Sequence, residues 1–271
     1  RRPPRSTPSN SSAASDVYKR QAVGSDIFGD FLEENLRRRG INSMLMRARR
    51  PTARNMIFVI QGEDRRFHLD PGANLDLDPD FVRRCVLEFS PDYISCRPGY
   101  SGMDMHMHEI LSDLMKTTVL LDVCRPYGKE WSYILSFLEY VNFFHSNLQE
   151  ASKITGETDE IKIIDSLLDR GVDAVLITSG GDGALFATED FIIRQRGFDI
   201  DAVDPTGAGD GYRAGLFVGM QKGYDIVTSA KIGSVVASFV IESEGAQTNL
   251  PDWERTLNRY KKEFGEIPQK S

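Results

Sequence analysis

The chain has 271 residues, 40% of them hydrophobic and 27% charged, with a formal net charge of −7. This length and composition fit an ordinary globular protein with one large α/β domain or two small ones. No stretch approaches the roughly 18 consecutive apolar residues of a membrane helix, and the acidic balance argues against general binding of nucleic acid or of anionic membranes.

The three cysteines have no C-x-x-C spacing and are odd in number. This pattern indicates neither a disulfide framework nor a zinc site. We therefore expect buried or incidental thiols in a reducing compartment, and a cytoplasmic location.

The first 21 residues are rich in Ser, Pro and Arg and have almost no apolar side chains before Val17. Such a composition cannot bury enough surface to offset the entropy of ordering, so we expect disorder. The segment also resembles a translated library-adapter sequence, and a natural basic tail is the alternative. We exclude residues 1–21 from the predicted domain and place that domain at residues 22–265.

From Ala22 onward, helical and strand patterns alternate at short spacing. Asp26 and Asp78 are expected to cap the first two helices, and further helices are expected at 103–115, 130–140, 147 onward, 159–170, 207–222, 225–242 and 252–264. Strands are expected at 92–96, 117–123, 141–145, 173–178, 183–187 and 191–193. This alternation predicts an α/β fold with a mostly parallel sheet between layers of helices.

Two β-rich runs interrupt the alternation, at residues 55–60 and 66–70. The segment Gly62-Glu63-Asp64 between them predicts a turn, so the two runs read as a hairpin. A small β appendage on an open α/β sheet often serves as a lid. We therefore expect residues 52–70 to form part of a β lid.

The sequence DPTGAGD at residues 204–210 directly precedes a predicted helix. The small residues Gly207, Ala208 and Gly209 let backbone amides approach a ligand closely, and the start of a helix is an anion site suited to phosphate. Asp210 falls in the first helical turn, where its carboxylate can accept the proton of an attacking hydroxyl. A glycine-rich turn with an aspartate capping the helix is the alternative.

Asn147 and Glu150 follow a predicted strand with the spacing N-x-x-E. At the carboxyl end of a strand, where open α/β sheets bind ligands, the two side chains could hold Mg²⁺ through water. The same spacing is also that of a helix-capping pair, so both interpretations stay open. Similarly, TSGGDG at residues 178–183 suits a nucleotide lying against backbone, or simply a turn between two strands.

Taken together, these motifs resemble the ribokinase-like (PfkB-type) carbohydrate kinase family. DPTGAGDGYRAGL at 204–216 resembles its C-terminal signature, N-x-x-E falls at its magnesium motif and TSGGDG at its nucleotide loop. VGSDIFGDFLEENLRRRGI at 23–41 looks like its early V-G-x-D-x-x-G segment. The similarity runs from about residue 22 to residue 251 in consistent order.

This resemblance implies a Rossmann-like sheet with a β lid, ATP as phosphoryl donor, Mg²⁺ and, in many members, K⁺. It makes Asp210 the catalytic base and residues 207–209 the anion hole, with Asn147 and Glu150 supporting Mg²⁺. The residues that would line the nucleotide are Asn147, Thr178, Gly180, Gly183 and Ser234. The candidates for the monovalent cation are Asp204 and the carbonyls near Thr206 and Gly245.

Family members have an initial strand, lid strands and a Gly-Gly loop ahead of the V-G-x-D segment, and nothing before Ala22 matches them. We therefore expect a chain that lacks these N-terminal strands. The predicted function is ATP-dependent phosphorylation of a sugar hydroxyl. The alternatives are a nucleoside kinase and a catalytically impaired nucleotide-binding fragment. We expect no nucleic-acid or membrane partner, and a homodimer formed through the lid.

Overall fold

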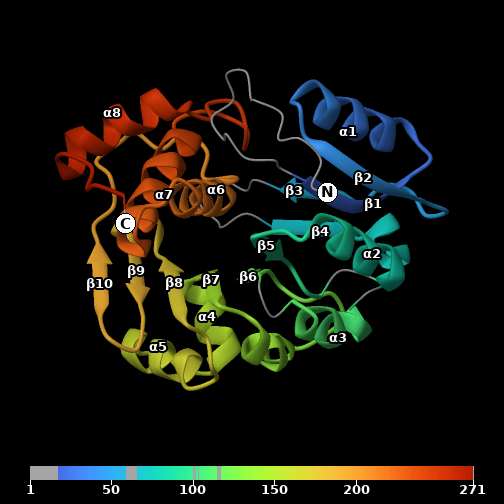
Figure 1. Ribbon diagram of the computed structural model, residues 1–271, viewed down its shortest axis with the longest axis horizontal. Coiled ribbons are helices and arrows are strands. Elements are labelled where there is room, and N and C mark those ends of the chain that lie inside the picture. The colour runs from blue at the N-terminus through green and yellow to red at the C-terminus, as the bar shows by residue number, and fades with distance from the viewer. Residues whose placement is uncertain (1–17, 59–65, 100–101, 103, 115–116, 271) are drawn as a thin grey trace. The chain divides into compact units, whose positions relative to one another are not determined.

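The computed structural model describes residues 18–58, 66–99, 102, 104–114 and 117–270. The chain divides into two compact units, an N-terminal unit within residues 16–142 and a C-terminal unit that contains residues 143–271. Figure 1 shows both units, coloured from blue to red along the chain. Each is described by itself.

The described residues of the N-terminal unit form three pairs of strands. The parallel pair β1 and β2 is joined through α1, the antiparallel pair β3 and β4 forms the hairpin, and β5 and β6 are parallel. Its elements are β1 (Tyr18–Gly24), α1 (Ile27–Arg38), β2 (Asn42–Ala48), β3 (Arg54–Phe58), β4 (Arg66–Asp70), η1 (Gly72–Asp76), α2 (Pro79–Phe89), β5 (Tyr93–Cys96), η2 (Asp104–His106), α3 (Met107–Ser112), β6 (Thr118–Asp122) and η3 (Trp131–Tyr140). The predicted hairpin is confirmed, although its predicted turn at 62–64 lies outside the described residues.

The predicted boundary of the tail is wrong at its C-terminal end. Residues 18–21 belong to β1, which pairs in parallel with β2 over the register Tyr18↔Asn42 to Gly24↔Ala48. Neither strand has a strong local pattern, and β1 takes its hydrogen bonds from a partner 24 positions away along this register. Pairing therefore decides the structure of residues 18–21, while residues 1–17 lie outside the described part of the chain.

The C-terminal unit is built on four adjacent strands in the order β7-β8-β9-β10. β7 and β8 are parallel, whereas β9 and β10 run antiparallel to their neighbours. The elements are β7 (Phe143–Asn147), α4 (Leu148–Thr155), α5 (Glu160–Leu168), β8 (Ala174–Thr178), η4 (Gly180–Asp182), β9 (Ala184–Ala187), β10 (Ile192–Gln195), α6 (Ala208–Gln221), α7 (Ile226–Ile241) and α8 (Trp253–Phe264). The predicted α/β architecture with parallel strands is confirmed, with an antiparallel β9–β10 extension.

The core of the C-terminal unit is formed by the strands and the late helices. Residues 175–177 of β8 are fully buried, as expected for a parallel strand covered on both faces. Helices α6 and α7 pack along each other, and α8 packs on α7 through a cluster that includes Ile232, Phe239 and Tyr260 (Figure 1). None of the described helices combines the length and the apolar content needed to cross a bilayer.

Among the predicted elements that differ in detail from the structure are the helix at 130–140 and the strand at 141–145. The segment predicted as a helix at 130–140 is the 3-10 helix η3, which begins at Trp131 without a side-chain cap. The strand predicted at 141–145 is β7 and lies two residues later, so that Asn147 ends the strand and also caps α4. This shift places the side chain of Asn147 directly at the carboxyl edge of the sheet.

Asp26 joins three segments of the N-terminal unit. Its carboxylate accepts hydrogen bonds from Gly29 N at 2.9 Å, Thr52 Oγ1 at 2.6 Å and Thr52 N at 2.8 Å. The buried Thr52 hydroxyl in turn accepts a bond from Gly24 N at 3.0 Å. These hydrogen bonds, first that from the Thr52 hydroxyl, lower the pKa of Asp26 from 3.8 to about 2.

Replacing Asp26 with asparagine should make unfolding less dependent on pH in the acid range. Because the pKa is lowered in the folded state, the ionised carboxylate stabilises the fold above its unfolded pKa, and this contribution is lost as the pH falls toward 2. Thermal unfolding from pH 7 to pH 2 should therefore show a Tm difference between wild type and variant that shrinks below about pH 4. The control is Asp78→Asn, at an N-cap where the carboxylate bonds to Asp80 N. Parallel Tm curves for Asp26→Asn and wild type would contradict this expectation.

Candidate active site

The carboxyl ends of β7 and β8 bring two of the predicted motifs together. The parallel register pairs Asn147 with Thr178, so the N-x-x-E motif and the start of the predicted nucleotide loop lie side by side. The hydroxyl of Thr178 donates to the carbonyl of Ser146 at 3.4 Å across the same strand pair. The edge at which open α/β sheets bind ligands therefore carries both motifs.

Asn147 and Glu150 form a complete capping box. Asn147 Oδ1 accepts from Glu150 N at 2.8 Å, and Glu150 Oε2 accepts from Asn147 N at 3.3 Å. Within the described residues, no group of three or more His, Cys, Asp or Glu side chains could hold a metal ion. Two oxygen-bearing side chains nevertheless suit Mg²⁺, which keeps several of its waters and seldom needs an all-protein cage.

The start of α6 differs from that of the other long α-helices. Six α-helices have an Asp or Asn side chain bonded to a backbone N–H of the first turn, namely Asp26, Asp78, Asn147, Asp159, Asp225 and Asp252. At α6 the cap is Gly207, with φ of 85° and no side-chain cap bond. Since helix geometry gives the first-turn N–H groups no intrahelical acceptor, this end is suited to an anion.

Asp210 lies in the first turn of α6 and is paired with Arg213 one turn later. Arg213 Nη2 donates to Asp210 Oδ1, and Arg213 Nη1 donates to His145 Nδ1 at 3.0 Å. His145 belongs to β7, two residues before Asn147 and on the same face of that strand. His145 and Asn147 are about 7 Å apart along the strand. Because Arg213 links Asp210 to His145, the helix that carries the predicted base contacts the strand that ends in the predicted magnesium pair.

Asp204 fixes the loop that leads into α6. Its Oδ1 accepts from Thr206 N at 2.9 Å, and its Oδ2 accepts from Gly245 N at 3.0 Å. The three predicted cation residues are therefore brought together, although Gly245 lies 41 positions from Asp204 in the sequence. The carboxylate of Asp204 thus connects the loop before α6 with the segment that follows α7 through these two hydrogen bonds.

The predicted nucleotide loop is a tight turn between β8 and β9. Ser179 N donates to the carbonyl of Gly183 at 2.8 Å, and Gly183 has φ of 96°. A Cβ at Gly183 would lie 2.0 Å from the carbonyl oxygen of Gln195, whereas a Cβ at Gly180 would meet nothing within 4 Å. Close packing therefore requires a glycine at position 183. At position 180 the space around the backbone is open, so a ligand could approach it.

Ser234 does not join this group of residues. It lies in α7, is 8% exposed, and its hydroxyl donates to the carbonyl of Ala230 at 3.4 Å. Its other neighbour is Tyr212 on α6: burial raises the pKa of this phenol, and its hydrogen bond with Ser234 partly offsets the rise. Ser234 therefore lies in the α6–α7 interface.

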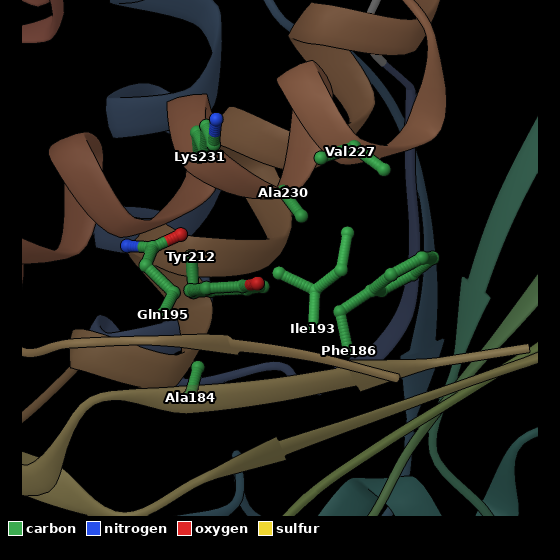
Figure 2. A pocket seen from close by; sticks show the side chains of 8 residues that line it. All are labelled: Ala184, Phe186, Ile193, Gln195, Tyr212, Val227, Ala230 and Lys231. Atoms are coloured by element: carbon green, nitrogen blue, oxygen red, sulfur yellow. The ribbon is translucent and has the colours of Figure 1, made fainter. Parts of the chain in front are cut away.

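Two cavities in the C-terminal unit have none of residues 204–210 in their lining. The one in Figure 2 is lined by residues of β9, β10, α6 and α7, with Phe186 and Ile193 pointing toward Val227 and Ala230. Its volume is about 10 Å³, roughly the room for one water. A wider cavity of about 380 Å³ lies beside residues 171–173, at the amino end of β8. Neither cavity therefore includes the predicted anion hole at residues 207–209.

Comparison with known proteins identifies the family. The model of the pfkB family carbohydrate kinases matches residues 15–253. The chain belongs to the pfkB family of carbohydrate kinases. The matched region of this chain begins three residues before β1, so it includes residues 18–21, which the structure also places in the fold.

Two proteins similar to this chain are named nucleoside kinases. The nucleoside kinase of Methanocaldococcus jannaschii is 39% identical over 50% of this chain and 44% of its own length. That of Methanothermobacter thermautotrophicus is 31% identical over 75% of this chain and 56% of its own length. The matched part of the chain thus spans about half the length of these two relatives.

The fold agrees with a solved member of the ribokinase family. The crystal structure of the M. jannaschii nucleoside kinase has a TM-score of 0.72 and 27% identity, covering 90% of this chain and 80% of that one. The expected ribokinase-like α/β fold is confirmed.

Sequence reasoning missed two side chains that are linked to the predicted base Asp210, namely Arg213 and His145. The spacing D-x-x-R places a cation one helical turn after Asp210, which is a detectable pattern. By contrast, His145 lies 68 positions before Arg213, so only the folded chain shows their contact.

Replacing Gly207 with alanine should destabilise the fold and weaken ATP binding. A Cβ there would lie 2.4 Å from the Cβ of Ala246, in addition to the strain of a left-handed φ. The control Gly156→Ala has a similar φ of 78° with nothing within 4 Å of the new Cβ, so it carries only the backbone cost of about 1–2 kcal/mol. Chemical denaturation and calorimetric titration with ATP measure the two effects. Equal losses in the two variants would show that the close approach to Ala246 is unimportant.

Proposed function

We propose that this chain transfers the terminal phosphoryl group of ATP to a hydroxyl of a sugar or nucleoside. The observation that supports this most strongly is the side-by-side placement of an uncapped, glycine-started helix and the carboxylate of Asp210. Phosphoryl transfer needs in-line positioning, charge neutralisation and a group that orients the nucleophile. The start of α6 provides the last two of these within one helical turn.

In the proposed reaction, the backbone N–H groups of Gly207 and Gly209 bond to the transferred phosphoryl oxygens. That of Ala208, which donates to the carbonyl of Pro205 at 3.2 Å in this structure, would turn to join them. The donors of Gly207 and Gly209 are fixed in place by the helix, so they stabilise developing negative charge without reorganising. Asp210 accepts the proton of the acceptor hydroxyl as its oxygen attacks phosphorus. The ADP oxygen leaves on the opposite side, and the phosphate ester is the product.

The cofactors of this proposal are ATP and Mg²⁺. Bound Mg²⁺ would neutralise charge on the phosphate oxygens, and Asn147 and Glu150 are the residues that would hold it through water. Thr178, Gly180 and Gly183 would line the nucleotide at the carboxyl edge of the sheet, and a role for Ser234, which is buried in α7, stays a prediction. A monovalent cation at Asp204, near Thr206 and Gly245, stays a prediction, as do the cytoplasmic location and the dimer formed through the hairpin.

The acceptor is proposed to be a nucleoside or a sugar, with the nucleoside favoured by two relatives. The proteins with 39% and 31% identity are named nucleoside kinases, while the family description names carbohydrate kinases. Both classes present a hydroxyl on a furanose or related ring, so one transfer mechanism serves both. Specificity must then come from contacts to the base or to the remaining hydroxyls.

A substrate panel with detection of ADP tests the proposal. Purified chain is incubated with ATP, Mg²⁺ and inosine, adenosine, ribose, deoxyribose or fructose, and the phosphorylated product is identified by mass spectrometry. Turnover with a nucleoside well above that with ribose or fructose supports the nucleoside acceptor, and the reverse order supports the sugar. If ATP binds but no acceptor raises ADP formation above background, the chain is a nucleotide-binding fragment and the proposed reaction is wrong for it.

A further inference from the structure

We propose that Arg213 is a positioning residue that holds the carboxylate of Asp210 toward the acceptor hydroxyl. This inference rests on the proposed role of Asp210 as the base. Arg213 lies within the signature at 204–216, but none of the roles predicted above involves its side chain. The evidence is the set of contacts that Arg213 makes inside the C-terminal unit.

Arg213 is a buried charge next to an exposed one. Only 9% of its side chain is exposed, against 69% for Asp210. Burial of a guanidinium costs free energy unless its donors find partners. Here its partners are Asp210 Oδ1 and His145 Nδ1, the latter at 3.0 Å. The arginine therefore holds the carboxylate from the interior, while most of the carboxylate surface faces outward.

The arrangement restricts the rotamers of Asp210. An exposed aspartate in a first helical turn samples several rotamers, and a general base must have its oxygen within hydrogen-bond reach of the proton it removes. A guanidinium presents its donors in a rigid plane, so a charge-assisted bond from it fixes direction as well as distance. A carboxylate has two oxygens with about four acceptor sites, so it can bond to Arg213 and still accept a hydroxyl proton.

His145 anchors the guanidinium to the sheet. Arginine has only donors, so Nδ1 of His145 must be an acceptor, which places the ring proton of a neutral imidazole on Nε2. The imidazole is 3% exposed and stacks on the ring of Tyr212, with centroids 5.6 Å apart and planes at 11°. Asp210 is thus connected through Arg213 to β7, the strand that also ends in Asn147.

A direct contact between Arg213 and the nucleotide is the competing explanation. In that case loss of the guanidinium would raise the KM for ATP, because a ground-state contact would be removed. A positioning role predicts instead a fall in kcat with the KM for ATP nearly unchanged. The two explanations therefore differ in a measurable way.

The test compares Arg213→Lys and Arg213→Met in steady-state kinetics. We expect kcat to fall about 10-fold for the lysine variant, which keeps the charge but loses the planar fork, and about 100-fold for the methionine variant. The KM for ATP should change by less than about threefold in both. The control Arg259→Lys alters a partly buried arginine whose Nη2 lies 3.1 Å from Glu242, away from α6, and should keep the wild-type kcat.

A double variant decides whether Arg213 acts through Asp210. In the Asp210→Asn background, Arg213→Met should cause little further loss of kcat, because the group that it positions is already removed. Multiplicative losses, or a raised KM for ATP at unchanged kcat, would overturn the positioning role. If Asp210→Asn itself keeps the wild-type kcat, the proposed base is wrong. If it loses activity while both Arg213 variants keep theirs, only the positioning role fails.

Thermal unfolding provides a readout that needs no turnover. Asp210→Asn and Arg213→Met should be coupled in their effect on Tm, because each removes one member of the same ion pair. Additive shifts would contradict the pair on which the inference depends. Should Arg213→Met fail to fold, Arg213→Lys retains the buried charge and decides the kinetic question alone.

Discussion

Replacing Asp210 with asparagine is expected to lower kcat by a factor on the order of 10² to 10⁴. The amide has nearly the same shape and still accepts a hydrogen bond, but it cannot take the proton of the attacking hydroxyl at neutral pH. Affinity for ATP should change little, since the first-turn N–H groups of α6 remain in place. Coupled detection of ADP at saturating ATP and acceptor measures kcat, and calorimetric titration measures ATP affinity.

Asp80 offers a matched control for this variant. It also lies in the first turn of a helix, its side chain is 74% exposed, and it has an arginine at i+3, with Arg83 Nη1 at 3.8 Å from its Oδ1. Asp80→Asn therefore repeats the chemical change at a similar helical position outside the proposed site, and its kcat should equal that of wild type. Unchanged turnover in Asp210→Asn would end the proposal that this carboxylate is the base.

Replacing Glu150 with glutamine is expected to raise the Mg²⁺ concentration needed for half-maximal activity on the order of 10- to 100-fold. Glutamine at this position can still close the capping box with Asn147, because its side-chain oxygen accepts the same backbone bond. The helix should therefore keep its stability while the negative charge near the metal is lost. Titration of activity with Mg²⁺ and measurement of Tm separate the two roles.

Glu160→Gln is the control for the magnesium variant. Glu160 lies in the first turn of α5, the next helix along the chain, and is ion-paired with Arg194. Its replacement should leave the Mg²⁺ requirement unchanged. An identical Mg²⁺ titration for Glu150→Gln and wild type would mean that Glu150 serves the fold only as a cap.

Much of the secondary structure was predictable because its determinants are local. The caps Asp26, Asp78 and Asn147 each bond to a backbone N–H within the next three residues, so the start of each helix is encoded in a short segment. The hairpin was predictable for the same reason, since two β-rich runs with a short connection pair with each other. The strands β1 and β2 were missed because their hydrogen bonds join residues 24 positions apart.

The sequence by itself determined the family and predicted the chemistry of the site, because glycines at 207 and 209, the following carboxylate and the N-x-x-E spacing are short-range patterns with a direct physical meaning. Only the tertiary structure decided that Asn147 lies beside Thr178, that Asp204 reaches Gly245, and that Arg213 links Asp210 to His145. It also placed Ser234 in a helix interface. Long-range contacts such as these arise from the packing of whole strands and helices, and no local segment encodes which side chains will meet.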